Sequence, residues 1–140
     1  MAKNILSVKL CQLDDCFEKL HRRIDLSQAE GPSKLELEIA ALERECVCAE
    51  AALMDKLENS KSYFVSVLAE GYEQVWNVVK ETQNRLEDIA AETPDSEIIA
   101  DEKTLLAEYV LDFAYRTADR ALLIAMEAID AQTIQQEGEV

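Results

Sequence analysis

The stretch "LSVKLCQLDDCFEKLHRRI", residues 6–24, carries apolar side chains at intervals of four and three residues. This spacing places them on one side of an α-helix and is typical of a seam between packed helices. The apolar positions are Leu6, Leu10, Leu13, Phe17, Leu20 and Ile24. The stretch therefore predicts an amphipathic helix over about 4–26.

A second stripe with the same steps follows the helix-breaking pair Gly31-Pro32. Ser33 and Glu36 have the spacing of a capping box, which marks the start of a helix. If the chain turns back at 27–32, the two stripes lie level in one antiparallel register, with Leu13 level with Cys46. The members of the second stripe are Leu35, Ile39, Leu42, Cys46, Ala49 and Leu53.

The stretch "AETPDSE", residues 91–97, predicts another turn. Thr93 is the expected N-cap and Pro94 the first residue of a last helix over about 94–135. Its predicted seam is Ile99, Leu106, Val110, Phe113, Thr117, Ala121 and Ile124. The expected partners on the preceding helix are Ile89, Thr82, Val78, Val75, Gly71, Val67 and Phe64.

The middle segment, 33–92, has two interpretations. A continuous helix of 60 residues would be about 90 Å long. The alternative is a turn at "ENSKS", residues 58–62. The apolar stripe passes through this stretch in phase and no Gly, Pro or capping box interrupts it, which slightly favours the continuous helix. We therefore expect an all-α antiparallel helical bundle in a single domain over 1–140, with a long middle helix or, if 58–62 is a turn, with four helices.

Two further apolar faces lie beside these seams. One is expected on the middle helix and one on the last. In the long-helix arrangement they should pair in a homodimer, and in the compact arrangement they should close within one chain. The expected interface residues are Val65, Leu68, Tyr72, Trp76, Leu111, Tyr115, Leu122 and Ile129.

The charge of this 140-residue chain is strongly acidic, with a formal net value of −15. Residues 1–34 hold six basic and five acidic residues (+1), and residues 35–140 hold eight and 24 (−16). Such a surface repels nucleic acid and anionic membranes. An acidic decoy that binds DNA-binding proteins is one alternative function. The N-terminal residues lack the apolar core of a signal peptide and no apolar run is long enough to span a membrane, so we expect a cytoplasmic protein with reduced thiols.

Four cysteines match the number of ligands in a structural zinc site, which needs four groups that converge tetrahedrally. On a helix Cys11 and Cys16 point about 140° apart, and Cys46 and Cys48 about 160° apart. Neither pair shares a face, so we expect Cys46 to be a small buried residue of the seam and the others to be incidental thiols. Zinc bound by all four is an alternative hypothesis, and Cys11 with Cys48 is the expected accidental disulfide.

Glu18-x-x-His21 has the spacing of ligands in di-iron bundles. Those sites need a second such motif and more inward-facing carboxylates, and His21 is the only histidine. Glu18 points about 130° away from the seam. We expect a solvated Glu18 and a histidine at the edge of the seam.

Glu70-x-x-Glu73 is followed by Glu92-x-x-Asp95. In spacing, this pattern resembles that of all-α nucleotide pyrophosphohydrolases of the MazG-like group, in which such carboxylates hold Mg²⁺ between helices. The resemblance covers less than a quarter of the chain, and Pro94 interrupts its second half. It implies an enzyme that hydrolyses nucleotide pyrophosphates with Glu70, Glu73, Glu92 and Asp95 as Mg²⁺ ligands.

The sequence predicts a non-enzymatic interaction module with no cofactor. Its clear seams, second apolar faces and acidic surface favour an adaptor, inhibitor or assembly factor. Such a protein would form a homodimer and bind a protein partner, without direct contact to nucleic acid or membrane. Mg²⁺-dependent hydrolysis and the acidic decoy are the alternatives.

Overall fold

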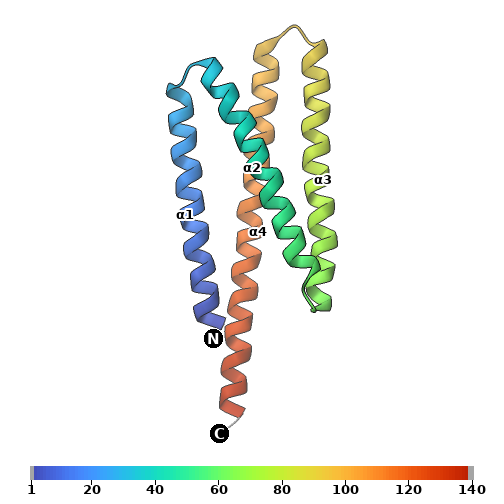
Figure 1. The fold of residues 1–140 in the computed structure, drawn as a ribbon. Helices are drawn as coiled ribbons and strands as arrows, with labels where there is room; N and C mark the ends of the chain where they lie inside the picture. The colour runs from blue at the N-terminus through green and yellow to red at the C-terminus, as the bar shows by residue number, and fades with distance from the viewer. Residues whose placement is uncertain (1, 139–140) are drawn as a thin grey trace. The chain divides into compact units, whose positions relative to one another are not determined.

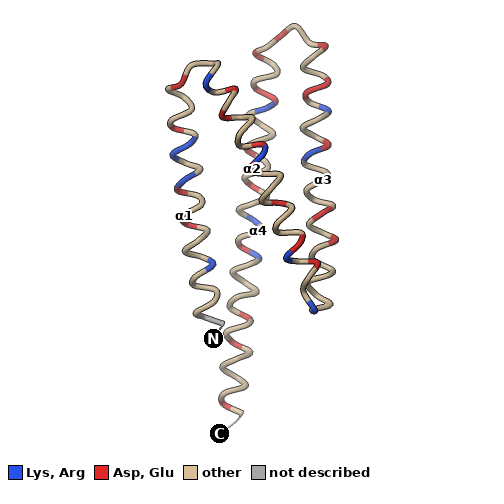
Figure 2. The backbone as a smooth tube through the Cα atoms, in the orientation of Figure 1, with Lys and Arg blue, Asp and Glu red and all other residues tan. Residues whose placement is uncertain are grey.

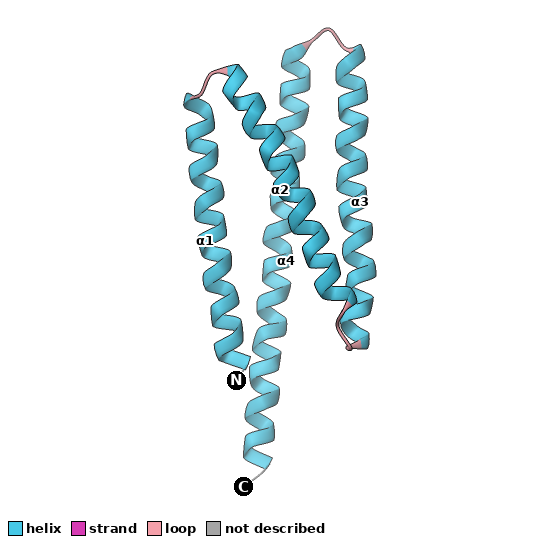
Figure 3. Ribbon diagram, in the orientation of Figure 1, coloured by secondary structure: helices cyan, strands magenta, loops and turns pink. Residues whose placement is uncertain are grey.

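The computed structural model describes residues 2–138, with side chains from residue 4 onward. Four helices account for nearly all of these residues: α1 (Ala2–Ala29), α2 (Pro32–Glu58), α3 (Tyr63–Glu92) and α4 (Ser96–Gly138) (Figures 1 and 3). No strand occurs in the part of the chain described. The all-α prediction is confirmed.

The chain falls into two compact units. The hairpin unit, Pro32–Val110, contains α2, α3 and the first part of α4. The terminal unit contains α1 and the second part of α4, over residues 2–31 and 111–138. The single domain expected from the chain length stays a prediction.

Residues 59–62 separate α2 from α3, so the slight preference for a continuous middle helix is wrong. Ser62 is the N-cap of α3: its backbone is extended and its side chain accepts a hydrogen bond from the Val65 N–H at 3.4 Å. The Ser60 hydroxyl accepts one from the Ser62 N–H at 3.3 Å. These local bonds satisfy backbone donors that would otherwise depend on a continuing helix, which is why serine-rich stretches favour turns.

Two other helix ends differ from the sequence prediction. Pro32 is the first residue of α2, which places Ser33 inside the first turn and excludes it as the cap of a capping box. Asp95, rather than Thr93, caps α4: its Oδ1 accepts hydrogen bonds from Glu97 N–H at 3.0 Å and Ile98 N–H at 3.3 Å. Thr93 instead has an extended backbone at the end of α3, because the ring of the following proline disfavours the helical region.

Within the hairpin unit, α2 and α3 are the most closely packed pair of helices. Ala69 of α3, at 5% exposure, is buried near their shared turn. Farther from the turn, Glu50 of α2 lies close enough to Tyr72 for its charge to act on the phenol. In Figure 1 the two helices separate with distance from the turn, so contact is concentrated at that end.

The contact between α3 and α4 uses a different face of α3 from the predicted one. Leu106 and Val110 of α4 lie on this contact, as expected. On α3 the facing residues are Val79 and Leu86, whereas the predicted Val78 is 62% exposed. Moving one residue along a helix turns the face by about 100°. The predicted alignment of α3 with α4 along their axes is therefore nearly correct, but the face of α3 predicted to meet α4 is wrong.

The helical segments of the terminal unit carry local ion pairs on their surfaces. In α1, Arg22 and Glu18 lie 2.9 Å apart, and in α4 Arg116 and Asp119 lie 2.9 Å apart. These pairs are exposed and contribute little to stability. The predicted pairing of the α1 stripe with α2 joins residues of different units and stays a prediction. No described helix has the length and apolarity that a membrane span requires.

The Ser62 cap can be tested by substitution. We expect Ser62→Ala to lower the free energy of unfolding by about 1 kcal/mol, because the first turn of α3 loses its side-chain acceptor. Ser62→Asn retains an acceptor and is the matched control, with a change of only a few tenths. Urea unfolding followed by circular dichroism measures both. Equal stability of the three proteins would show that Ser62 does not cap α3.

Candidate functional site

Helix α3 carries two apolar stripes about 100° apart around its axis. One is partly covered within the hairpin unit and is called the inner face here: Val65, Ala69, Tyr72, Trp76, Val79, Leu86 and Ala90. The other, called the outer stripe, lies largely open to solvent: Phe64, Val67, Gly71, Val75, Val78, Thr82 and Ile89. Together they make α3 apolar over more of its circumference than one neighbouring helix can cover.

The outer stripe begins with an aromatic pair. Phe64 is 81% exposed and its ring meets that of Tyr63 edge to face, with 5.7 Å between centroids. Gly71 lies at the middle of the stripe, and an added Cβ there would meet no atom within 4 Å. The sequence pattern predicts that this stripe contacts the last helix, whereas the structure leaves it largely exposed. A glycine in the interior of a helix was the available signal.

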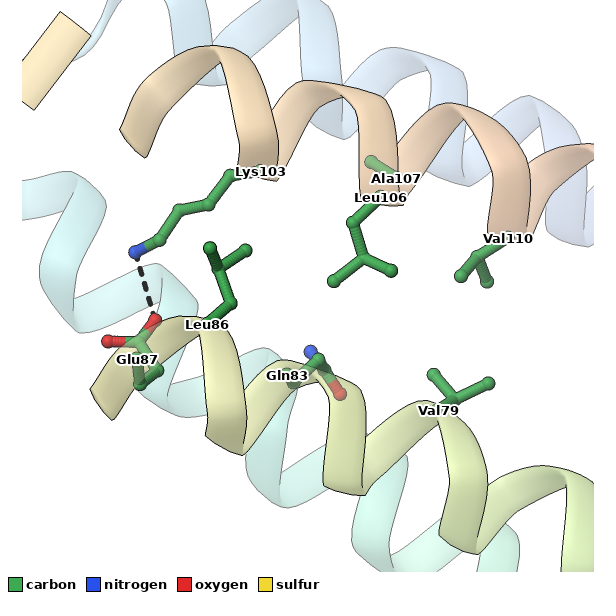
Figure 4. Close-up of a pocket in the computed structure, with 8 residues that line it drawn as sticks. All are labelled: Val79, Gln83, Leu86, Glu87, Lys103, Leu106, Ala107 and Val110. Atoms are coloured by element: carbon green, nitrogen blue, oxygen red, sulfur yellow. Dashed lines mark ion pairs between the residues drawn. The ribbon is translucent and has the colours of Figure 1, made fainter. Parts of the chain in front are cut away.

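Between the inner face and α4 lies an open groove of about 290 Å³ (Figure 4). Lys103 reaches across it from α4 to Glu87 of α3, with Nζ and Oε1 2.9 Å apart. The remaining lining residues are Val79, Gln83, Leu86, Leu106, Ala107 and Val110. One amide and one ion pair among apolar side chains suit a small apolar group better than a charged substrate.

The four carboxylates of the pyrophosphohydrolase-like pattern do not converge in the hairpin unit. Glu70 and Glu92 lie on the same helix, and 22 residues separate them by about 33 Å along its axis. Asp95 caps α4 with its side chain. Among the residues described, no cluster of three or more potential metal ligands occurs. One Mg²⁺ ion cannot bridge the two halves of the pattern within this unit.

All four cysteines are exposed, so the prediction that Cys46 is buried in a seam is wrong. Cys46 lies on α2 beyond Glu50, Met54 and Leu57, which are the residues partly covered near the turn. Since α2 separates from α3 in that direction, α3 does not cover Cys46. The predicted seam of Cys46 against Leu13 joins residues of different units. Cys11 and Cys16 belong to the terminal unit and Cys46 and Cys48 to the hairpin unit, so a Cys11–Cys48 disulfide stays a prediction.

The Glu18–His21 pair is solvated rather than arranged for metal binding. Glu18 pairs with Arg22, as the sequence predicts for an outward-facing carboxylate. His21 lies 3.5 Å from Asp25, and its side chain is 79% exposed. It is therefore more exposed than expected for a residue at the edge of a seam.

The expected interface residues divide into two groups. On α3, Val65, Tyr72 and Trp76 are partly covered in the hairpin unit, while Leu68 stays exposed. Trp76 also has the Lys80 ammonium 4.9 Å from its ring. On α4 all four residues are exposed: Leu111, Tyr115, Leu122 and Ile129. These four belong to the terminal unit, and their pairing with α3 in a dimer stays a prediction.

No protein-family model, curated protein or solved structure matches the chain. The candidate site is therefore defined from the geometry of this chain alone. It consists of the outer stripe of α3 and the adjoining α3–α4 groove.

The contact between α2 and α3 predicts a pH effect. Burial raises the pKa of Tyr72 above its ordinary 10.0, and the negative charge of Glu50 raises it further. The folded state thus holds the phenol proton more tightly than the unfolded state. This contribution to stability is present below pH 10 and is lost as the pH rises through the raised pKa.

We expect Glu50→Gln to lower the pKa of Tyr72, but not to its ordinary value, because burial is the larger cause. Tyrosinate absorbance, titrated with and without Tyr72→Phe, isolates this phenol from the other three. Glu43→Gln on the same helix is the control and should leave the pKa unchanged. An identical titration in Glu50→Gln and wild type would show that α2 does not hold Glu50 beside Tyr72.

The separation of the carboxylates predicts that Mg²⁺ has no specific effect. We expect the Tm in millimolar Mg²⁺ to equal the Tm in NaCl of the same ionic strength. This should hold for the wild type and for Glu70→Gln/Glu73→Gln. Pyrophosphate release from nucleoside triphosphates should stay at background. A Tm rise with Mg²⁺ that the double substitution abolishes would restore the enzyme hypothesis.

Proposed function

We propose that this protein is a non-enzymatic helical interaction module that self-associates through exposed apolar helix faces. The observation that carries the proposal is the small extent of its core. Among the described residues Ala69 is the one buried apolar side chain, while large apolar residues along every helix remain exposed.

The free-energy balance of folding supports self-association. Ordering a residue costs about 1–2 kcal/mol of backbone entropy, and apolar burial is the main term that offsets it. A helical chain that leaves Phe64, Tyr63 and Leu68 in water gains little stabilisation from apolar burial. Covering these side chains against another polypeptide supplies the missing burial, so folding and association reinforce each other.

The surface charge supports a protein partner for the assembled module. Acidic residues are spread along α3 and the first part of α4 (Figure 2). They repel the phosphates of nucleic acids and anionic lipids. With its apolar faces covered by a second copy, the module would present mainly acidic surface, which is complementary to a basic protein surface. An adaptor, inhibitor or assembly role fits this arrangement.

The proposal includes a reducing location, the cytoplasm. Exposed thiols at Cys11, Cys16, Cys46 and Cys48 would cross-link neighbouring copies in an oxidising compartment. A reductant therefore belongs in every measurement of association.

We expect the protein to elute as a species of about 31.6 kDa, twice the 15.8 kDa of one chain. Light scattering behind a sizing column, under reducing conditions and over a range of concentrations, measures this mass. Because apolar burial drives association while the net charges repel, raising the salt concentration should strengthen it. A mass of 15.8 kDa at every concentration and salt level would refute self-association.

A further inference from the structure

We propose that the outer stripe of α3 is a two-fold symmetric dimer interface, in which α3 packs antiparallel against α3 of a second copy and the axis passes beside Gly71. This inference rests on the proposed self-association and specifies its surface, register and partner. The partner is a second copy of this chain rather than an unrelated protein.

The spacing of the outer stripe is symmetric about Gly71. Phe64 and Val78 lie seven residues before and after it, and Val67 and Val75 lie four before and after it. A two-fold interface requires this self-complementarity, because each residue must meet the same partner in both copies. In the antiparallel register Val67 meets Val75 of the second copy and Phe64 meets Val78. In a stripe whose steps alternate strictly between three and four residues, every member has its nearest neighbours at unequal distances before and after it. The symmetry about Gly71 is therefore not a consequence of the ordinary heptad pattern.

No contact among the described residues explains a glycine at position 71. A glycine inside a helix costs about 0.5–1 kcal/mol relative to alanine. The space above it is open and its φ is not positive, so neither packing nor backbone conformation explains the residue. At the crossing point of two helices, however, a missing side chain lets the backbones approach closely. The residue at the symmetry centre is thus the one that a close crossing requires.

The composition around Gly71 is that of an interface core. Residues 62–79 contain two charged residues in 18, Glu70 and Glu73, although 31% of the whole chain is charged. Both lie at least about 100° from the centre of the stripe. Of the four aromatic residues in this segment, Tyr72 and Trp76 belong to the inner face, and Tyr63 and Phe64 lie at the exposed end of the proposed interface. Depletion of charge distinguishes interface cores from other surface.

The exposed area is sufficient for a stable contact. An aromatic side chain buries about 150–250 Å² when fully covered. Tyr63 and Phe64 are 75% and 81% exposed, so covering them in both copies removes about 600 Å² from water. A specific interface needs about 1,000 Å² in total. The three valines of the stripe and the neighbouring Leu68, exposed in both copies, supply the remainder.

Substitution of Gly71 tests the proposal without weakening the helix. Leucine is a better helix former than glycine, and the Cβ that it adds at this position meets no atom within 4 Å. It would, however, separate the two backbones at the crossing. We expect Gly71→Leu to raise the Kd of dimerisation at least about tenfold while the Tm of the monomeric fraction does not fall. The matched control is Asn77→Leu, which adds the same side chain to another face of α3 and should leave the Kd unchanged.

Sedimentation equilibrium of wild type and the two variants separates the outcomes. A wild-type monomer would overturn both this inference and the proposed function, with the stripe then covered by its own chain. A wild-type dimer that Gly71→Leu leaves intact would overturn this inference alone and assign self-association to other faces, such as Leu111 and Tyr115. Loss of the dimer in both variants would also overturn it, because the effect would not be specific to the stripe.

Cross-linking tests the register directly. In a chain whose four exposed cysteines are changed to serine, we expect Gly71→Cys to form a disulfide-linked dimer on mild oxidation, because a residue beside the axis lies next to its own copy. Asn77→Cys should stay reduced under the same conditions. Cross-linking at position 77 but not at position 71 would overturn the proposed symmetry.

Discussion

A helix in water must cover its apolar surface, and α3 has more of it than its own neighbours cover. Two stripes about 100° apart run along α3, and α2 near the turn and α4 beyond it meet the inner one. The open α3–α4 groove and the exposed outer stripe both follow from this imbalance. The hairpin unit is best understood as part of a larger packed structure.

The strong negative charge limits how the exposed apolar surface can be covered by other chains. A chain with a net charge of −15 resists non-specific aggregation even when apolar residues are exposed. Repulsion of this kind is long-ranged and screened by salt, whereas apolar contact is short-ranged and depends on fit. Only a surface that is locally poor in charge can bring two such chains together. The segment around Gly71 has that property, and the charged second half of α3 does not.

The sequence predicted the helices, both outer loops and nearly the register of α3 against α4, because periodicity and helix breakers are local signals. It did not predict which face of α3 turns inward, since a shift of one residue selects between two apolar stripes of similar length. The end of α2 was missed because the stripe stays in phase through Ser60, whereas the hydrogen bonds of Ser60 and Ser62 decide the break. Cys46 was expected to be buried because it continues the apolar stripe of α2, and spacing alone does not reveal how far a position is covered.

The short turn at 59–62 also bears on how copies of this chain can exchange parts. Its apolar stripe is continuous through Leu57, Ser60 and Phe64, and a capping serine of the kind that holds it contributes only about 1 kcal/mol. Straightening it would join α2 and α3 into one helix and release α2 from its own hairpin. Such a hinge is the usual starting point for domain swapping, in which each chain completes its neighbour's fold with an identical element. The same four residues that close the hairpin therefore also set the barrier to intertwined assemblies.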